Sequence, residues 1–467
     1  MPTERKSGDP RLRLVPSIDE LLRTEPATEL RATIGVRRIT ALARLVTAEI
    51  RAAIKSSGEE GDAFTAEALL ETAARRLQEI STLESRNGIR NVINATGVIL
   101  HTNLSRAPLS KVAQAAINEE AAQYCSLKYD SATGLRGKRG ARVEALLRDL
   151  TGAEDALVVN NCAAAALLVL GVIAGDGETL VSRGELVEIG GDFRVPDVMA
   201  SSGTRMIEIG TTNKTHLDDY RKAISAKTRL IMRVHPSNYR VVGFVSSPSL
   251  EELTSLAREA MIPLYEDAGS GQLSDLKGIE GEPVIRDLIS AGADLVSFSG
   301  DKLLGSVQAG MIVGRRGIIN RLRRHPLYRA LRSDKIRLAA LEATLLAHQK
   351  GTQEEEIPVI QMLAIPASQI EDRASSLISK VTNTSLALEV TDSESAIGGG
   401  AGPNANLPTR VIAVSHETLS AQELENALRS AVPPVVARIA EQKVLLDLRT
   451  VFADQEPLLV NALNNLK

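Results

Sequence analysis

The sequence predicts an α/β fold built on a mostly parallel seven-stranded sheet that helices cover on both faces. Short apolar runs alternate with amphipathic helical segments from about residue 150 onward, a pattern typical of repeated strand and helix units. The chain has 467 residues, which is long enough for two or three domains. The runs expected to form the strands are 156–159, 179–182, 206–209, 230–234, 264–266, 295–298 and 311–313.

Composition excludes several classes of protein. The 55 basic and 58 acidic residues nearly balance, so any nucleic-acid binding must be local. The two cysteines, Cys125 and Cys162, have no metal-ligand spacing and fit a reducing compartment. The longest apolar run, 162–174, is too short to span a bilayer. We therefore expect a cytoplasmic protein that neither crosses a membrane nor holds a metal.

Residues 1–60 are expected to form a separate helical module. Ser17 and Glu20 have the spacing of a capping box ahead of an apolar run. The first 58 positions hold eleven basic and seven acidic residues, and such a surface either contacts phosphates or simply faces solvent. A long helix is expected within 61–90 as a linker that holds the module away from the core.

The core is expected over 91–350. It begins with a short strand at 98–100 and a loop that carries Arg106, whose guanidinium could grip an anion although most loop arginines are solvated. Ser110 is expected to cap the next helix. A glycine-rich basic segment, 133–142, could also approach phosphates.

Small and polar residues follow the expected strands, at the sheet edge where open α/β folds bind their ligands. Asn161, Cys162 and Ala163 open an alanine-rich helix, and bare N–H groups at a helix start favour a phosphate. Asp267 follows another strand, where a carboxylate could keep a pyridinium nitrogen protonated. Each feature alone also fits an ordinary helix start or turn.

Two further strand ends complete the pattern. His235, Ser237 and Asn238 could face the ring of a cofactor or its phenolic oxygen. Lys302 comes just after Ser299 and Asp301 at the end of an apolar run, and a buried neutral amine is suited to forming a Schiff base with an aldehyde. The order of phosphate loop, ring contacts, acid and lysine predicts a pyridoxal-phosphate (PLP) site, with Ser299 as a phosphate contact.

Residues 351–467 are expected to form a smaller α+β domain. Strands at 410–414 and 444–448 should alternate with a helix at 421–428, and 398–406 is a loop of glycines and polar residues. The segment shows no chemistry of its own. Packing and closure over the substrate are its expected roles.

Long segments of the chain resemble bacterial selenocysteine synthase, the L-seryl-tRNA(Sec) selenium transferase family. They include INATGVILHTNLSRAPLS, SRGELVEIGGDFRVPDVM, VHPSNYRVVGF, DAGSGQL and SFSGDKLLGSVQAG, in order along nearly the whole chain. The family's usual HTNLGRA, NNNAAA, DLGSG and LLGGPQAG are HTNLSRA, NNCAAA, DAGSG and LLGSVQAG in this sequence. None of these departures removes an acid, an arginine or the lysine.

The resemblance implies a fold-type-I PLP-dependent transferase with a helical tRNA-binding domain at residues 1–60, usually assembled as a decamer of five dimers. It implies conversion of seryl-tRNA(Sec) to selenocysteyl-tRNA(Sec), through loss of the seryl hydroxyl to an aminoacrylate and addition of selenium from selenophosphate. Lys302 would hold PLP, Asp267 would pair with the ring nitrogen and Asp301 would act as a catalytic acid.

The family's anion clamp would fall on Arg106, Arg329 and Arg332. The last two would share one helix face if their segment is helical, and together they would form a cradle for selenophosphate. In this family the clamp and the PLP site draw on neighbouring subunits.

Two alternatives remain open at this stage. One is a PLP-dependent lyase or aldolase for a small amino acid or amino sugar, against which the module at 1–60 argues. The other is a tRNA-binding protein without activity, which Lys302, Asp267 and Asp301 make improbable.

Overall fold

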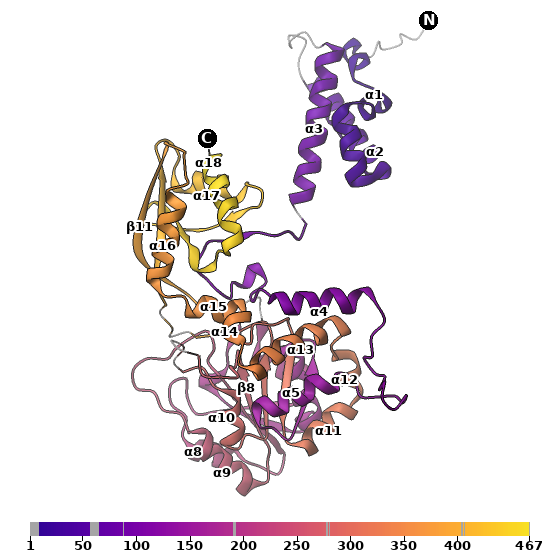
Figure 1. Ribbon diagram of the computed structural model, residues 1–467. Helices are drawn as coiled ribbons and strands as arrows, with labels where there is room; N and C mark the ends of the chain where they lie inside the picture. The colour runs from indigo at the N-terminus through magenta and orange to yellow at the C-terminus, as the bar shows by residue number, and fades with distance from the viewer. Residues whose placement is uncertain are drawn as a thin grey trace, which may run out of the picture. The chain divides into compact units, whose positions relative to one another are not determined.

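A computed structural model describes residues 9–56, 65–86, 88–189, 193–276, 279, 281–402, 405 and 407–466. The chain divides into two compact units, Met1–Asn91 and Val92–Lys467 (Figure 1). The helix that was expected as a separate linker within 61–90 belongs to the first unit, and the second unit begins at Val92, next to the position at which the core was expected to begin. None of the helices among these residues is long and apolar enough to cross a membrane.

The N-terminal unit consists of α1 (Ile18–Leu22), α2 (Glu25–Ser56) and α3 (Ala66–Arg86). The expected capping box opens α1: the Ser17 N–H donates to Glu20 Oε2 at 2.8 Å, and the Glu20 N–H donates to Ser17 Oγ at 3.2 Å. The helix α3 packs its apolar face on α2 because side chains of both helices are buried in one hydrophobic cluster. This shared core explains why α3 belongs to the unit rather than standing alone as a linker.

The larger unit is built on a seven-stranded sheet in the order β2-β10-β9-β8-β7-β3-β6. The strand β10 is antiparallel to both of its neighbours and the other pairings are parallel. The expected α/β class and all seven expected strands are confirmed. The strands are β2 (Asp155–Val159), β3 (Glu178–Ser182), β6 (Arg205–Ile209), β7 (Thr228–Val234), β8 (Leu264–Gly269), β9 (Leu295–Ser299) and β10 (Gly310–Gly314).

Helices cover both faces of this sheet, because successive buried side chains of a strand point to opposite sides. In β7, Leu230 and Met232 face one hydrophobic cluster and Ile231 faces another. The first face is covered by α6 (Cys162–Ala174), α7 (Val195–Ser201), α11 (Arg316–Arg324) and α12 (Pro326–Leu331). The opposite face is covered by α5 (Ala141–Thr151), α8 (Leu217–Ala223), α9 (Leu250–Ala260), α10 (Ile285–Ser290) and α13 (Lys335–Lys350).

Two local features were expected at the start of the core, and the structure contains one of them. Ser110 caps α4 (Lys111–Ala122) by accepting a hydrogen bond from Ala113 N at 3.2 Å, as expected. The strand expected at 98–100 is wrong: Val98 makes a single bridge to Ala396 and a turn follows. Residues 99 and 100 form this turn, so the extended backbone ends at Val98.

The C-terminal part of the larger unit holds a four-stranded antiparallel sheet in the order β11-β12-β15-β14. Its strands are β11 (Leu386–Ser395), β12 (Leu407–His416), β14 (Arg438–Ala440) and β15 (Lys443–Asp447). The helices α16 (Ala367–Ile378), α17 (Ala421–Arg429) and α18 (Glu456–Asn464) share one hydrophobic core with this sheet. Early residues join the same core, because β1 (Ile93–Asn94) pairs with β13 (Val435–Val436). The expected strands and helix of this part are confirmed.

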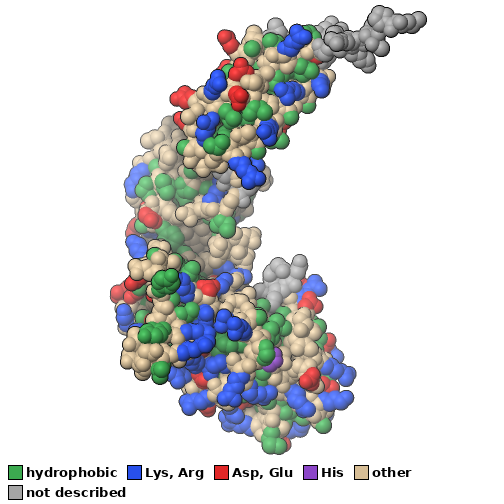
Figure 2. Space-filling model, turned by 90° about the vertical axis from the view of Figure 1, so that its right-hand side faces the viewer, with side chains coloured by type: hydrophobic (Ala, Val, Ile, Leu, Met, Phe, Trp, Pro, Cys, Tyr) green, Lys and Arg blue, Asp and Glu red, His purple; other side chains and the backbone are tan. Residues whose placement is uncertain are grey.

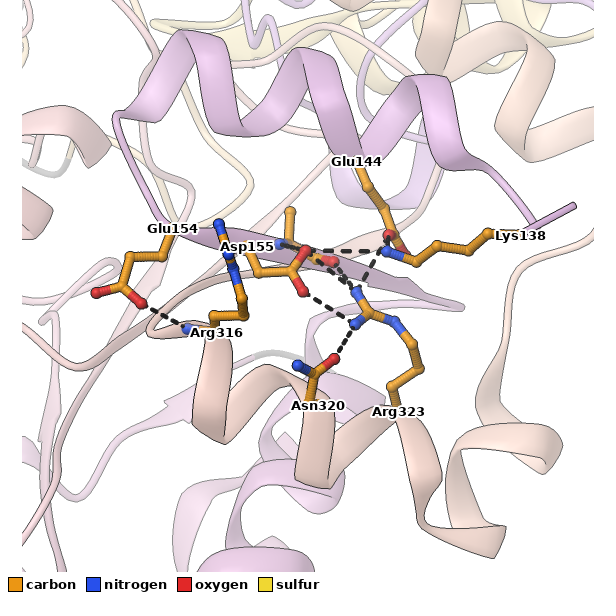
Figure 3. Close-up of polar contacts among 8 residues, drawn as sticks. Lys138, Glu144, Glu154, Asp155, Arg316, Asn320 and Arg323 are labelled. Carbon is orange, nitrogen blue, oxygen red and sulfur yellow. Dashed lines mark hydrogen bonds and ion pairs between the residues drawn. The ribbon is translucent and has the colours of Figure 1, made fainter.

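A network of charged side chains ties α5 and α11 to the edge strand β2 (Figure 3). Arg323 donates to Asp155 Oδ2 at 2.9 Å and to Glu144 Oε2 at 3.1 Å, and both acids are buried. Lys138 pairs with Glu144 as well. Burial raises the pKa of Glu144, although Lys138 and Arg323 oppose this effect. The guanidinium of Arg323 therefore balances much of the buried negative charge of the two carboxylates.

We expect Arg323→Leu to destabilise the larger unit by about 3 kcal/mol, because it leaves two buried carboxylates with one partly exposed cation. The matched control is Arg324→Leu, which removes an exposed arginine at the next position of α11. Differential scanning calorimetry of both variants measures the effect. Equal midpoints for the two variants would contradict the structural role of Arg323.

His348 in α13 makes the stability of the fold depend on pH. Its Nε2 lies 3.4 Å from the carbonyl oxygen of Leu304, and burial lowers the pKa of His348 to about 4. The unfolded chain takes up this proton near pH 6.5 and the folded chain does not, so stability is present above that pH and is lost as pH falls toward 4. We expect a loss of about 2 kcal/mol between pH 7 and pH 5. His348→Gln should reduce this loss in thermal unfolding, and an unchanged pH dependence would refute the assignment.

Candidate active site

The expected lysine and acid lie together at the carboxyl edge of the sheet. Asp301 and Lys302 directly follow β9, and both are buried, at 5% and 6% exposure. Lys302 Nζ lies 3.5 Å from the carbonyl oxygen of Gly400, which comes from the C-terminal part of the unit. Lys302 therefore places a buried amine at this edge.

Asp267, at the end of β8, is held through one of its two carboxylate oxygens. Its Oδ1 accepts hydrogen bonds from Ser297 Oγ at 2.8 Å, from Cys162 Sγ at 3.4 Å and from Gly269 N at 3.4 Å. No hydrogen bond from a described residue reaches Oδ2. Burial raises the pKa of Asp267, while the hydrogen bonds and the charge of Lys302 act in the opposite direction. One oxygen of a buried carboxylate is thus left for a ligand.

Asp301 accepts a hydrogen bond on each carboxylate oxygen. Ser299 Oγ donates to Oδ1 at 2.7 Å and Arg106 Nη1 donates to Oδ2 at 2.9 Å. Arg106 and Ser105 both adopt left-handed backbone conformations, with φ of 60° and 70°, which are uncommon for non-glycine residues and cluster at functional sites. Ser299 has a single hydroxyl proton and donates it to Asp301. This hydroxyl therefore orients Asp301 and does not act as a donor to a phosphate.

The start of α6 lies against the same acid, since Cys162 Sγ contacts Asp267. Asn161 caps the helix by accepting a hydrogen bond from Ala164 N at 2.8 Å. This cap leaves the N–H groups of Cys162 and Ala163 without an acceptor among the described residues. Open N–H groups at the positive end of a helix of 13 residues favour an anion there.

The loop after β7 contributes differently from the expectation. His235 is next to the acid: its backbone N–H donates to the Asp267 carbonyl oxygen at 3.0 Å, and its Nε2 lies 3.5 Å from Glu282 Oε1. Asn238 is exposed, and its Nδ2 donates to the Glu188 carbonyl oxygen at 2.8 Å. The structure therefore brings His235 to the site and turns Asn238 away from it.

Ser237 also comes from this loop, and its side chain lies beside Gly269, as that of Lys302 does. Its side chain is 1% exposed and its Oγ has no hydrogen-bond partner among the described residues. A Cβ atom added at Gly269 would lie 3.8 Å from Ser237 Oγ and 3.9 Å from Lys302 Nζ. The glycine thus keeps open the space between a buried hydroxyl and the amine.

Arg329 and Arg332 do not form the expected helical pair. Arg329 lies in α12, but Arg332 follows the end of that helix in an extended backbone that bridges to Val159 of β2. The helix ends there because the chain joins the edge of the sheet. No described contact joins either arginine to Arg106.

The two arginines belong instead to a concentration of positive charge. The pKa of Lys128 is lowered, first by desolvation and then by the charges of Arg332, Arg136, Arg139 and Arg329. Figure 2 shows Lys and Arg side chains gathered on one face of the larger unit. The glycine-rich segment 133–142, which was expected to approach phosphates, therefore lies within the positive electrostatic field of Arg329 and Arg332. Among the described residues, no His, Cys, Asp and Glu cluster could hold a metal ion.

Comparison with known proteins gives consistent results. A family profile described as L-seryl-tRNA selenium transferase matches residues 92–452. An L-seryl-tRNA(Sec) selenium transferase of Geotalea daltonii is 43% identical, covering 97% of this chain and 99% of the relative. Relatives with the same name from Alkaliphilus metalliredigens and Moorella thermoacetica are each 44% identical and are covered over 98% and 96% of their lengths.

A solved structure, described as D-glucosaminate-6-phosphate ammonia-lyase, has a similar fold. It aligns with a TM-score of 0.58 and 20% identity, covering 82% of this chain and 97% of that one. At this identity the likeness supports the fold class alone. The expected fold class of fold-type-I PLP-dependent enzymes is confirmed.

Proposed function

The chain belongs to the L-seryl-tRNA selenium transferase family, and we propose that it converts L-seryl-tRNA(Sec) to L-selenocysteyl-tRNA(Sec). The observation that carries the proposal is the convergence of Lys302, Asp267 and Asp301 at one buried sheet edge. A lyase or aldolase for small amines is not favoured, because relatives that are 43–44% identical over nearly their full lengths are named as selenium transferases.

We propose that the cofactor of this reaction is PLP, and the residues present fit it. Lys302 would hold the cofactor through its amine, and the free Oδ2 of Asp267 suits a protonated ring nitrogen. Gly269 leaves a small space beside Ser237 and Lys302 that the side chain of another residue would fill, and the open N–H groups of α6 suit a phosphate. When bound, PLP supplies an electron sink for the carbon that loses its proton.

The protein's own side chains then have separable roles. Asp267 keeps a proton on the ring nitrogen from its fixed position on β8. Asp301 lies next to Lys302, and its carboxylate can take a proton from the lysine ammonium and pass it to the departing hydroxyl, while Arg106 and Ser299 fix its orientation. Burial of these groups excludes water and strengthens their electrostatic interactions.

We expect Asp301→Asn to lower the rate of selenium transfer by roughly 10²–10⁴-fold with PLP still bound, since general acid and base groups contribute about that much. Ser299→Ala is the graded comparison, because it removes one of two hydrogen bonds to Asp301 and keeps the carboxylate. Single-turnover kinetics of both variants measures the effect. Full activity in Asp301→Asn would exclude a proton-transfer role for this acid.

We propose that Arg329 and Arg332, with the positive charge around Lys128, attract the selenophosphate donor. Because no described contact joins Arg106 to Arg329 or Arg332 within one chain, we propose that Arg106 completes this clamp with the pair of another copy. Supporting this association, several large apolar side chains of the larger unit are strongly exposed, among them Tyr124, Val242 (74%), Phe244 (87%), Met261 (92%) and Val432 (84%). Sedimentation velocity should give an oligomer, with a decamer as the expected size.

The proposed function is tested by incubating the purified chain with PLP, selenophosphate and seryl-tRNA(Sec), followed by mass analysis of the aminoacyl group. We expect selenocysteine on the tRNA. A parallel incubation with free serine and with an amino sugar phosphate tests the alternative. Turnover of a free amine without any change of seryl-tRNA would favour a lyase and contradict the proposal.

A further inference from the structure

Asp267 is held by a chain of buried hydroxyl groups. Tyr265 and Asp267 point to the same face of β8 because side chains two residues apart share a face. In the neighbouring strand β9, Ser297 is the residue paired with Asp267. The Tyr265 hydroxyl lies 2.7 Å from Ser297 Oγ, and Ser297 Oγ lies 2.8 Å from Asp267 Oδ1.

The direction of these hydrogen bonds follows from the number of protons. Ser297 has a single hydroxyl proton, and an ionised Asp267 can only accept, so Ser297 donates to Asp267. Tyr265 must then donate to Ser297. Burial raises the pKa of the Tyr265 hydroxyl well above its usual value, so it keeps the proton that this arrangement needs. Both side chains are fully buried, at 0% exposure.

We propose that Tyr265 and Ser297 are positioning residues, forming a hydrogen-bond relay that saturates Oδ1 of Asp267 and leaves Oδ2 alone for the ring nitrogen of PLP. This inference rests on the proposed function, because it assumes that PLP is the cofactor. Cys162 supports the relay weakly, since its thiol lies 3.4 Å from the same oxygen and a thiol is a weak donor.

The relay decides which partner holds the proton shared by Asp267 and the ring. Donors on Oδ1 stabilise the carboxylate form of the acid, and thus keep the proton on the ring nitrogen. Without them, the buried acid becomes a stronger base and competes more strongly for this proton. The relay therefore acts on the electron-withdrawing power of the cofactor and not on its attachment to Lys302.

The test uses the full-length holoenzyme reconstituted with PLP that carries ¹⁵N in the ring, whose chemical shift reports whether the ring nitrogen is protonated. In Ser297→Ala we expect the ratio of protonated to unprotonated ring to fall about tenfold, the size that one hydrogen bond to a charged group supports. Tyr265→Phe should give a smaller shift in the same direction, because it weakens the relay from its far end. Cys162→Ala should shift the ratio less than either.

The matched control is Thr179→Val. It deletes a fully buried hydroxyl that is hydrogen-bonded to Thr204 Oγ1 at 2.8 Å near the opposite end of the parallel strands. The control should keep the wild-type ¹⁵N signal. An unchanged signal in both Ser297→Ala and Tyr265→Phe, or an equal shift in Thr179→Val, would overturn the relay. Failure of the wild-type chain to take up PLP would instead overturn the proposed function itself.

Discussion

Lys302→Ala is expected to abolish the visible absorbance of the PLP-loaded protein and to lower selenium transfer by roughly 10³-fold or more. The amine is the group that would bind the aldehyde of the cofactor covalently. It is buried at 6% exposure beside Asp267, whose ionised form its charge favours. Loss of the amine therefore removes the attachment point of the cofactor. It also removes a positive charge that favours the ionised form of Asp267, a buried acid whose pKa is already raised. Absorbance spectroscopy and single-turnover kinetics measure the two effects.

The matched control is Lys350→Ala, which removes an exposed lysine at the end of α13. This variant should keep both the absorbance band and the activity. Retention of the band in Lys302→Ala would show that another lysine holds the cofactor. Exogenous amines should partly restore turnover in Lys302→Ala, because they replace a missing amine without restoring its position.

Deletion of residues 1–91 should remove tight binding of seryl-tRNA while leaving PLP uptake intact. The cut follows the boundary between the two compact units, so each keeps its own hydrophobic core. A cut at residue 60 would instead strip α1 and α2 from α3 and expose its apolar face. Filter binding of seryl-tRNA and PLP absorbance measure the two properties. Unchanged tRNA affinity would refute an RNA-binding role for the N-terminal unit.

A point variant tests the same role in the intact chain. Arg37, Arg44 and Arg51 are exposed and lie seven residues apart on α2, which puts them on one face of the helix. Replacing all three with alanine should weaken tRNA binding and lower the slope of its salt dependence by about two to three. An unchanged slope would show that this face does not contact phosphates.

The strands and the acidic and basic groups at their ends were predictable because each depends on local sequence. Six of the seven strands of the large sheet are largely buried runs, and only the edge strand β6 is mostly uncovered. Asp267 lies near the end of β8, and Lys302 follows β9. The carboxyl ends of parallel strands share one edge, so topology alone brings these two side chains together. The capping residues Ser17 and Ser110 were predictable for the same reason, since a cap needs only its own helix.

Features that depend on distant partners were not predictable. Asn238 and Ser237 are adjacent in sequence, and only the course of the loop after β7 decides which one faces Lys302. Arg332 leaves its helix to join the edge of β2, a contact between segments more than 170 residues apart. The donors that converge on Asp267 come from α6, β8 and β9, and their register is a property of the assembled sheet.

The central claim is that the buried edge around Lys302 is the catalytic centre. Reduction of the PLP-loaded protein with borohydride makes the bond between cofactor and lysine permanent, and peptide mass spectrometry then identifies the lysine that carries it. We predict one modified peptide, which contains Lys302. A label on any other lysine, or no label after PLP uptake, would contradict the account.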